Sequence, residues 1–154
     1  MAAEGSEAYK ELYNVIEKRH LEAIKQLVHA RRQSGVVAET KCILNELDDI
    51  LHGIYLVKEL SPKMKDFILS FGERLSAHII AEAFKESEVD ARFTDSRQLI
   101  VTDRKFGNAQ VKFDATNEQI KNYFLAAQGA LHIIPGFVGR SEKNETTTLG
   151  RGGS

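Results

Sequence analysis

Apolar residues recur every three or four positions through most of the first 88 residues. This spacing predicts amphipathic helices, because residues three and four apart lie on one face of an α-helix. The pattern is clear over residues 9–32, where Glu, Lys and Arg occupy the intervening positions, and it returns over residues 43–55. Gly35 lies between the two stretches, so we expect the first helix to be interrupted there.

A third helical pattern follows Ser61-Pro62. Serine is a preferred N-cap residue and proline is favoured at the first helical position, so this pair predicts a helix start. Apolar residues then continue at helical spacing to Phe84. Gly72 lies inside this stretch, where glycine costs about 1 kcal/mol relative to alanine, and it indicates either a break or a close backbone approach.

After Glu88 the pattern changes to short segments that are rich in strand-forming residues and separated by turn residues. Such segments predict strands or extended chain at residues 89–94, 99–102 and 110–113. Residues 131–134 have the same character, and we expect a buried strand there.

A fourth helix is expected before the last of these segments. Thr116-Asn-Glu-Gln119 has the spacing of a capping box, and the helix that it opens can be closed by Gly129. Strands that alternate with helices imply at least some parallel pairing. The predicted fold class is therefore α/β in one domain, residues 1–154, with a mainly helical region over 1–88 and an α/β region over 89–154.

The charge balance limits the classes of partner. Twenty-one Lys and Arg residues oppose 22 Asp and Glu residues, which gives a net charge of −1. No overall positive field attracts nucleic acid or an anionic membrane, so we expect neither as a partner. No apolar run approaches the roughly 20 residues that span a bilayer.

Cysteine and histidine give no support for a disulfide or a metal site. Cys42 is the one cysteine, and the first residues lack the features of a signal peptide, so we expect a reducing, cytoplasmic setting. Without a neighbouring Cys or His, Cys42 is expected to be a buried structural thiol and not a nucleophile. No two of the five histidines lie three or four residues apart, and we expect no metal ligands in this chain.

The segment 71–76 has one feature of a ligand site and one simpler interpretation. Gly72 would let a partner approach the backbone beside Glu73 and Arg74, which interrupt an apolar helical face. The two opposite charges are also typical of a surface ion pair.

The segment 146–154 is open to two interpretations in the same way. Its small residues and Arg151 can surround an anion with backbone N–H groups and a guanidinium group. Its glycine-rich end is also typical of a flexible linker. Five of the eleven glycines lie from residue 136 onward, so we expect backbone geometry to matter more there than side-chain burial.

Four motifs join these segments into one pattern. They are, in order, Phe71-Gly-Glu-Arg-Leu-Ser76, then Asp95-Ser-Arg-Gln-Leu-Ile-Val-Thr-Asp103 with Phe106-Gly-Asn-Ala109, then Pro135-Gly-Phe-Val-Gly139, and Thr146-Thr-Thr-Leu-Gly-Arg-Gly-Gly-Ser154. In this order and approximate spacing they resemble the aspartate kinases, which phosphorylate L-aspartate with ATP on the way to lysine, threonine and methionine. The resemblance extends from about Tyr9 onward. It implies part of a three-layer α/β/α amino-acid-kinase fold with an incomplete sheet.

The resemblance also implies that the substrate is held at its two ends. Glu73 would receive the α-ammonium group of aspartate, and Arg151 would bind the α-carboxylate with its guanidinium fork. The other residues implied in the aspartate site are Phe137, which would form a wall of the pocket, and Gly152, Gly153 and Ser154, which would complete the substrate loop.

The same resemblance implies ATP with Mg²⁺ in the parent enzyme. Aspartate kinases begin with a strand and a Lys-Phe-Gly-Gly-Thr-Ser motif, and nothing like it precedes Tyr9. An Asp, the nucleotide-binding segment and the regulatory domains would follow Ser154. We therefore expect an internal fragment that is inactive alone, holds no cofactor, and associates with itself through open strand edges or exposed apolar faces.

Two other functions stay open. The chain could be the kinase half of a bifunctional aspartokinase/homoserine dehydrogenase, although the wording of the last motif resembles the single-function enzymes better. It could also be a non-catalytic helical module whose amphipathic helices bind a partner. In that last case, changing Glu73 or Arg151 would leave the activity of a parent enzyme untouched.

Overall fold

The computed structural model describes residues 1–127 and 129–150. The chain divides into two compact units, Met1–Ser61 and the residues from Pro62 onward. The first unit is helical, and the second contains two α-helices together with all the strands of the described residues. The third helix of the sequence therefore belongs with the strands that follow it.

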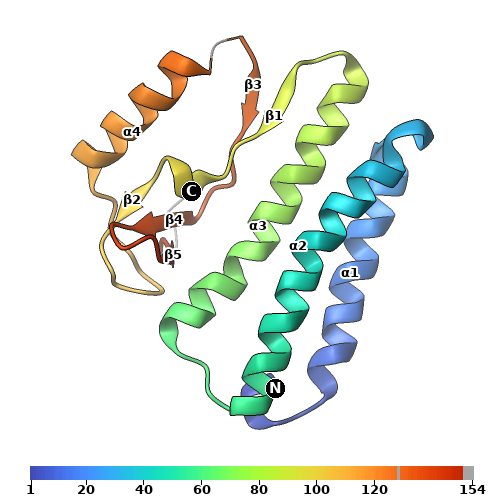
Figure 1. Ribbon diagram of the computed structural model, residues 1–154, viewed down its shortest axis with the longest axis vertical. Helices are drawn as coiled ribbons and strands as arrows, with labels where there is room; N and C mark the ends of the chain where they lie inside the picture. The colour runs from blue at the N-terminus through green and yellow to red at the C-terminus, as the bar shows by residue number, and fades with distance from the viewer. Residues whose placement is uncertain (128, 151–154) are drawn as a thin grey trace. The chain divides into compact units, whose positions relative to one another are not determined.

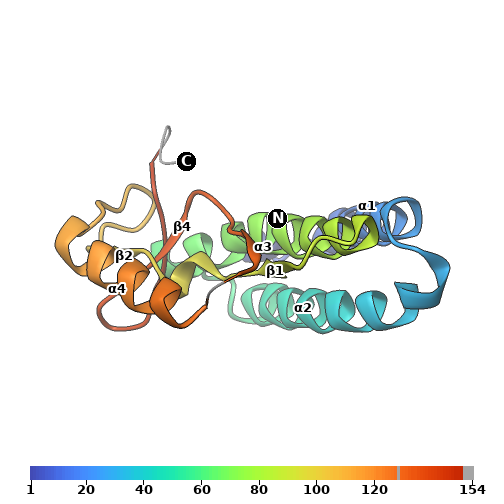
Figure 2. The ribbon, with the colours of Figure 1, turned by 90° about the horizontal axis from the view of Figure 1, so that it is seen from above.

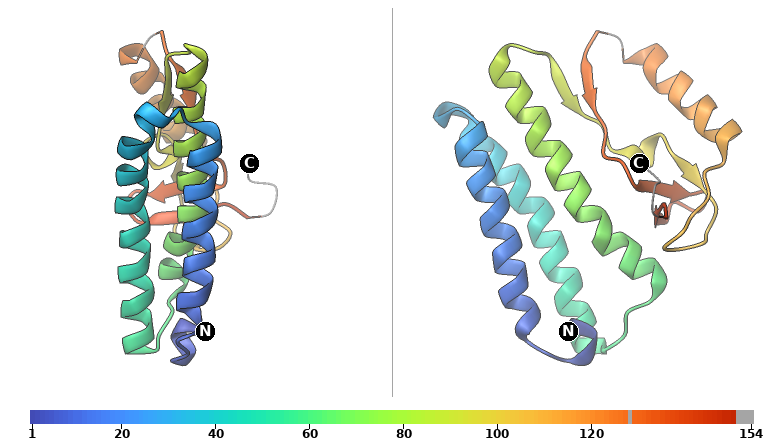
Figure 3. Two further views of the ribbon diagram at one scale, coloured as in Figure 1. Left: turned by 90° about the vertical axis from the view of Figure 1, so that its right-hand side faces the viewer. Right: turned by 180° about the vertical axis from the view of Figure 1, so that it is seen from behind.

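The first unit is a pair of helices. α1 (Ala8–Leu27) follows a short 3-10 helix, η1 (Ala2–Glu4), and α2 (Ala30–Val57) runs back alongside α1 (Figures 1 and 3). The two helices bury apolar residues that recur at helical spacing. These residues are Tyr9, Tyr13, Ile24, Val36, Leu44, Leu47 and Ile54.

The break between the two helices lies at His29, so the prediction of a break at Gly35 is wrong. His29 has an extended backbone, with φ −61° and ψ 142°. The side chain of Gln33 donates hydrogen bonds to the carbonyl oxygen of Lys25, in the last turn of α1, and to that of Val28, which directly follows the helix. Gly35 lies inside α2, where its cost of about 1 kcal/mol is outweighed by the packing of the helix.

Cys42 is exposed on α2, so the prediction of a buried thiol is wrong. Thr40 and Leu44, two residues before and after it, are both fully buried. Two residues along an α-helix correspond to a rotation of about 200°, which places Cys42 on the opposite face.

The second unit begins with α3 (Pro62–Phe84), which starts at the predicted proline and continues without a break. Gly72 is exposed on this helix, and among the described residues a Cβ atom added there would meet nothing within 4 Å. The expected break at Gly72 is therefore wrong, and no described residue makes a close approach to its backbone. A 3-10 turn, η2 (Lys85–Ser87), follows the helix.

Two small sheets follow α3. β1 (Ala91–Phe93) pairs in parallel with β3 (Leu131–Ile133), and β2 (Val101–Thr102) pairs in parallel with β4 (Val138–Ser141). β4 also pairs in antiparallel orientation with β5 (Thr146–Thr148). Figures 1 and 2 show the strands between α3 and α4 (Phe113–Ala126). The predicted α/β class, the parallel pairing and the incomplete sheet are confirmed.

α4 begins at Phe113, three residues before the predicted cap. Thr116 is 4% exposed, and its hydroxyl group accepts a hydrogen bond from Val101 N (3.0 Å) and donates one to Val101 O (3.2 Å). The predicted capping box is wrong because this hydroxyl joins α4 to β2 instead of capping the helix. The extended segment expected at 110–113 reduces to one bridge between Val111 and β2, since Phe113 is already helical.

Two predictions about burial are also wrong. Leu131 in β3 is 44% exposed, because among the described strands β3 pairs only with β1. Thr146, Thr147 and Thr148 in β5 are 8%, 0% and 1% exposed, although backbone geometry was expected to matter more than burial there. These side chains are buried because β5 lies against α3 as well as β4.

We predict that Thr116→Val lowers the free energy of unfolding by about 1–3 kcal/mol, because the buried N–H group of Val101 loses its acceptor. Urea unfolding followed by circular dichroism measures this change.

Thr40→Val is the matched control. Thr40 is fully buried, and its hydroxyl has no hydrogen-bond partner within residues 1–127 and 129–150. Its removal is expected to change the free energy of unfolding by less than about 0.5 kcal/mol, or to raise it. An equal loss in both variants would show that the link from Thr116 to β2 contributes nothing specific.

Candidate functional site

The inner side of the candidate site is a line of buried polar residues on α3, which we call the polar stripe. Its members lie four residues apart, so they follow one another along one side of the helix. They are Asp66, Ser70, Arg74, His78 and Glu82, and each is 9% exposed or less. Buried polar groups need partners within the protein, so the polar stripe determines what can pack against α3.

Asp66 receives its partners from two other segments. Its Oδ2 atom accepts hydrogen bonds from Gly107 N (2.9 Å) and Thr148 N (2.8 Å), and its Oδ1 atom accepts one from the Thr148 hydroxyl group (2.8 Å). The Thr148 carbonyl oxygen in turn accepts a hydrogen bond from Ala109 N (3.0 Å). One carboxylate thus holds the loop after β2 and the last residue of β5 against α3.

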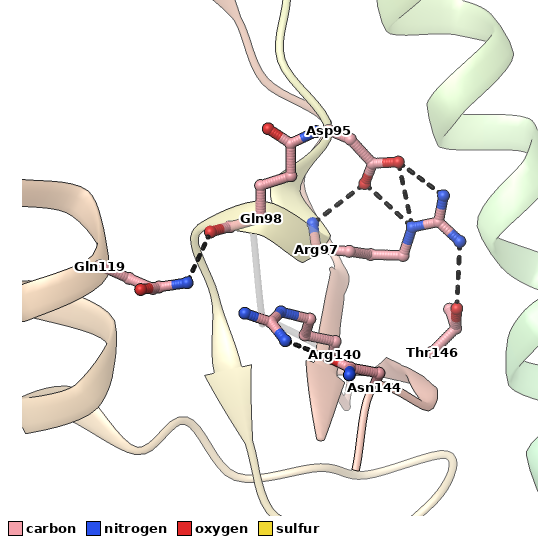
Figure 4. Close-up of a pocket in the computed structure, with 7 residues that line it drawn as sticks. All are labelled: Asp95, Arg97, Gln98, Gln119, Arg140, Asn144 and Thr146. Atoms are coloured by element: carbon pink, nitrogen blue, oxygen red, sulfur yellow. Dashed lines mark hydrogen bonds and ion pairs between the residues drawn. The ribbon is translucent and has the colours of Figure 1, made fainter. Parts of the chain in front are cut away.

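Arg74 begins a second connection between α3 and β5. Its Nε atom lies 3.7 Å from Oδ2 of Asp95, and its guanidinium carbon lies 4.9 Å from the centroid of the Phe71 ring. Asp95 also accepts hydrogen bonds from Nε (3.0 Å) and Nη2 (2.6 Å) of Arg97, whose Nη1 atom donates to the Thr146 hydroxyl group (3.2 Å) (Figure 4). Both ends of β5 are therefore linked to α3 through charged side chains.

Two arginines keep the carboxyl group of Asp95 ionised. Burial raises the pKa of this carboxyl group, but hydrogen bonds from Arg97 and the positive charges of Arg97 and Arg74 lower it by more, so the pKa lies below its ordinary value. Asp95 is therefore ionised at neutral pH.

A pocket of about 460 Å³ lies beside this connection. Figure 4 shows that Arg97, in the wall of the pocket, points toward Asp95 and Thr146. On the other side of the wall, Arg140 donates a hydrogen bond to Asn144. The complete lining is Asp95, Arg97, Gln98, Gln119, Arg140, Asn144 and Thr146. Arg97 is paired with the carboxylate of Asp95, whereas Arg140 donates to the neutral amide of Asn144, so the lining of the pocket is polar and includes both signs of charge.

The turn between β4 and β5 is held by Glu145. Its carboxylate accepts hydrogen bonds from Nε (2.6 Å) and Nη2 (3.0 Å) of Arg104, from the Ser141 hydroxyl group (3.0 Å) and from Lys63 (3.3 Å). The hydrogen bonds from Arg104, with those from Ser141 and Lys63, outweigh the opposing effect of burial and lower the pKa of Glu145 to about 2.

The described structure locates two of the residues implied in the aspartate site. Glu73 is exposed on α3, and no described residue forms an ion pair with it. The interpretation of Glu73 and Arg74 as a surface ion pair is therefore wrong, because Arg74 is buried beside Asp95. Phe137 is half-buried before β4, with φ 65°, and its carbonyl oxygen accepts a hydrogen bond from Leu149 N (2.9 Å).

The other implied residues, Arg151, Gly152, Gly153 and Ser154, lie outside the described residues. The segment that leads to them is described as far as Gly150, and β5 ends at Thr148, three residues before Arg151. The hydrogen bond from Leu149 N to Phe137 O places the backbone at Phe137 beside the end of β5.

Sequence reasoning missed Asp66 and gave no role to Asp95 or Arg97. A signal for Asp66 was present, because polar residues recur every four positions from 66 to 82. The same spacing is usual on a solvent-exposed helix face, so it does not reveal burial. The partners of Asp66 lie 41 and 82 residues away, and no local pattern connects them.

Two kinds of site find no support in residues 1–127 and 129–150. No group of three or more His, Cys, Asp or Glu side chains is arranged there to hold a metal ion. No helix within these ranges is both long and apolar enough to cross a membrane.

Comparison with known proteins gives consistent matches. The model of the amino acid kinase family matches residues 3–154. Aspartokinase 3, chloroplastic, of Arabidopsis thaliana is 33% identical over 149 residues, which cover 92% of this chain and 26% of that protein. The chain is thus similar to about a quarter of the length of this relative.

Solved structures of Escherichia coli aspartokinase III have the same fold over this region. The complex with lysine and aspartate (T-state) matches with a TM-score of 0.89 and 29% identity, and the complex with aspartate and ADP (R-state) with 0.86 and 27%. Each match covers 99% of this chain and 34% of the E. coli chain.

We predict that part of the stability of the β4–β5 turn is lost in acid. The folded pKa of Glu145, about 2, is below its ordinary value of 4.5, so its contribution is complete above about pH 4.5 and disappears as the pH falls toward 2. The difference in unfolding free energy between the wild type and Glu145→Gln should therefore shrink between pH 6 and pH 2.5, as measured by urea unfolding at each pH.

Arg104→Gln provides the control background, since Arg104 is the main cause of the lowered pKa. In that background Glu145→Gln should show a smaller dependence on pH. An unchanged dependence would contradict the assignment to this ion pair.

Proposed function

Since the chain belongs to the amino acid kinase family, we propose that it is part of an aspartate kinase, which transfers the γ-phosphate of ATP to the β-carboxylate of L-aspartate. The observation that carries the proposal is the connection of α3, where Glu73 is exposed, to the β5 strand that leads to Arg151. This arrangement suits a substrate held at two ends. The aspartokinase names of the similar proteins support the substrate class.

In this proposal Glu73 binds the α-ammonium group of aspartate and Arg151 binds its α-carboxylate. A carboxylate opposite the ammonium group compensates for the water that the substrate loses, and a guanidinium group matches a carboxylate with two parallel hydrogen bonds. The exposure of Glu73 supports its role, because the carboxylate is accessible to a small ligand.

Phe137 forms a wall of the pocket, and Gly152, Gly153 and Ser154 complete the loop around the substrate. The hydrogen bond between Leu149 N and Phe137 O supports the placement of Phe137, because it holds that segment next to the start of this loop.

The protein does not have to activate the nucleophile. The β-carboxylate of aspartate has an ordinary pKa of about 3.9 and is already ionised at neutral pH, so no general base is needed. Catalysis then depends on holding the carboxylate in line with the transferred phosphoryl group and on neutralising the charge there.

ATP with Mg²⁺ belongs to the proposal as the co-substrate that the resemblance to the aspartate kinases implies. No cluster of acidic or histidine side chains in residues 1–127 and 129–150 suits a metal ion. We derive no step of phosphoryl transfer from the residues of this chain.

We predict that Glu73→Gln, in the full gene product that contains this chain, raises the KM for L-aspartate at least tenfold and leaves the KM for ATP within twofold. The reason is the loss of a charge-assisted contact, worth about 1.5–3 kcal/mol, to the substrate ammonium group. A coupled assay of ADP formation with varied aspartate measures both constants.

Glu118→Gln is the control, because Glu118 is an exposed helical glutamate on α4 and undergoes the same chemical change. Its kinetic constants should match those of the wild type. If Glu73→Gln behaved like this control, Glu73 would not be an aspartate ligand, and a non-catalytic helical module would become the better description.

The 154-residue chain by itself is expected to lack kinase activity. The match covers 26% of the Arabidopsis enzyme and 34% of the E. coli chain, so most of the length of each relative has no counterpart in these 154 residues. Purified chain incubated with ATP, Mg²⁺ and aspartate should release no ADP above a blank without aspartate. Turnover that depends on aspartate would overturn this prediction.

A further inference from the structure

We propose that the pocket beside Arg97 and Arg140 binds a small organic anion, and that Arg140 receives the carboxylate or phosphate group of this ligand. The pocket of about 460 Å³ lies among η3 (Ser96–Gln98), α4, β4, β5 and the turn between these two strands. None of its lining residues is among those that the proposed function gives to aspartate, so the inference does not rest on that proposal.

Arg140 lacks an acidic partner, and in this it differs from the other described arginines of the second unit. Its guanidinium group donates to the side-chain oxygen of Asn144, a neutral amide, and no described carboxylate forms an ion pair with it. The other arginines each lie 3.7 Å or less from a carboxylate oxygen, and they are Arg74, Arg92, Arg97 and Arg104. The positive charge of Arg140 is therefore not compensated within the described part of the chain.

The acidic side chains closest to Arg140 in the sequence are paired with other cations. Glu142 lies 2.8 Å from Lys112, and Glu145 lies 2.6 Å from Arg104. Neither carboxylate neutralises Arg140, so an anion from outside the chain can take that place.

The lining of the pocket has a net positive charge. Asp95 and Arg97 approach to 2.6 Å, and their opposite charges cancel. The uncharged members of the lining are Gln98, Gln119, Asn144 and Thr146. Arg140 contributes the charge that remains, and a concave surface with one sign of charge attracts ions of the other sign.

The donors of Arg140 are accessible from the pocket. Figure 4 shows its guanidinium group directed from β4 toward the side where Gln119 lies, with Asn144 on the opposite side. A guanidinium group matches two oxygens of a carboxylate or phosphate group with parallel hydrogen bonds. The Gln119 amide donates to Gln98 O (3.3 Å), which links α4 to η3 and closes this wall of the pocket.

The size of the pocket fits a small molecule better than a single ion. Ligand pockets have volumes of roughly 300–1,000 Å³, and this one has about 460 Å³. The side-chain amides of Gln98 and Asn144 can donate to oxygens or accept from hydroxyl groups. The ligand is therefore an organic anion with polar groups beside its charged group.

The experiment uses the gene product that contains this chain and measures hydrogen exchange by mass spectrometry at increasing probe concentration. The two probes are glycerate and glycerol 3-phosphate, which carry the same hydroxyl groups but differ in the anionic group. Glycerol is the neutral reference. Sodium chloride keeps the ionic strength equal in all samples, so that screening is constant.

Two variants change the charge of the pocket. Arg140→Gln removes its cation. Gln98→Glu adds a negative charge at an exposed position whose side chain forms no hydrogen bond with another described residue, so this variant is expected to fold. Arg92→Gln is the matched control, because Arg92 is exposed, pairs with Asp90 and does not line the pocket.

We expect at least one of the two anionic probes to slow the exchange of residues 95–98 and 140–146, with a Kd of about 1 mM. Glycerol should leave this exchange unchanged. Arg140→Gln and Gln98→Glu should each raise the Kd by about tenfold or more, since a charge-assisted contact is lost or opposed. Arg92→Gln should keep the wild-type Kd. An effect of glycerate alone identifies a carboxylate as the anionic group of the ligand, and an effect of glycerol 3-phosphate alone identifies a phosphate.

Three results would overturn the inference. They are the absence of slower exchange with either anionic probe, an equal effect of glycerol, and an unchanged Kd in Gln98→Glu or in a folded Arg140→Gln. The measurement does not need kinase activity, so its failure would leave the proposed function intact. A wild-type KM for aspartate in Glu73→Gln would likewise leave this site intact.

Discussion

A carboxylate that water cannot reach has to be satisfied by the protein, and in this chain that requirement organises the second unit. Asp66 on α3 binds the loop that contains Gly107 and the end of β5 at Thr148. Leaving any of these donors or the carboxylate without a partner would cost more than an ordinary hydrogen bond gains. The carboxylate therefore holds the loop and the strand against the helix. The pairing of β5 with β4 and the hydrogen bond from Arg97 to Thr146 are formed in the same arrangement.

The other charged groups of the site differ in how firmly they hold β5 and the turn before it in position. Asp95 and Arg97 are mostly buried and face each other with several short hydrogen bonds, so they hold Thr146 in a defined place. Glu145 is also largely buried, but Arg104 and Lys63 are about half exposed, and pairs of this kind contribute little because solvent screens them. The inner links from α3 thus set the position of β5, and the outer ion pairs support the turn before it.

The helices were predicted well and their limits less well. Helical spacing of apolar residues located α1, α2 and α3, because burial against a neighbour leaves that period in the sequence. The errors at Gly35 and Thr116 have one cause: a local signal worth about 1 kcal/mol was outweighed by a contact made elsewhere. Gln33 satisfies the end of α1 six residues after Leu27, and the hydroxyl group of Thr116 binds β2.

The sequence by itself determined the α/β class, the helical front half and the four motifs that resemble the aspartate kinases, since periodicity and motif order are local or linear properties. The tertiary structure decided which polar residues are buried and what they bind. In the sequence, Asp66 is indistinguishable from an exposed polar position of a helix. Its burial depends on hydrogen-bond partners in a loop 41 residues later and in a strand 82 residues later. Such partners are brought together by packing, and no spacing along the chain records them.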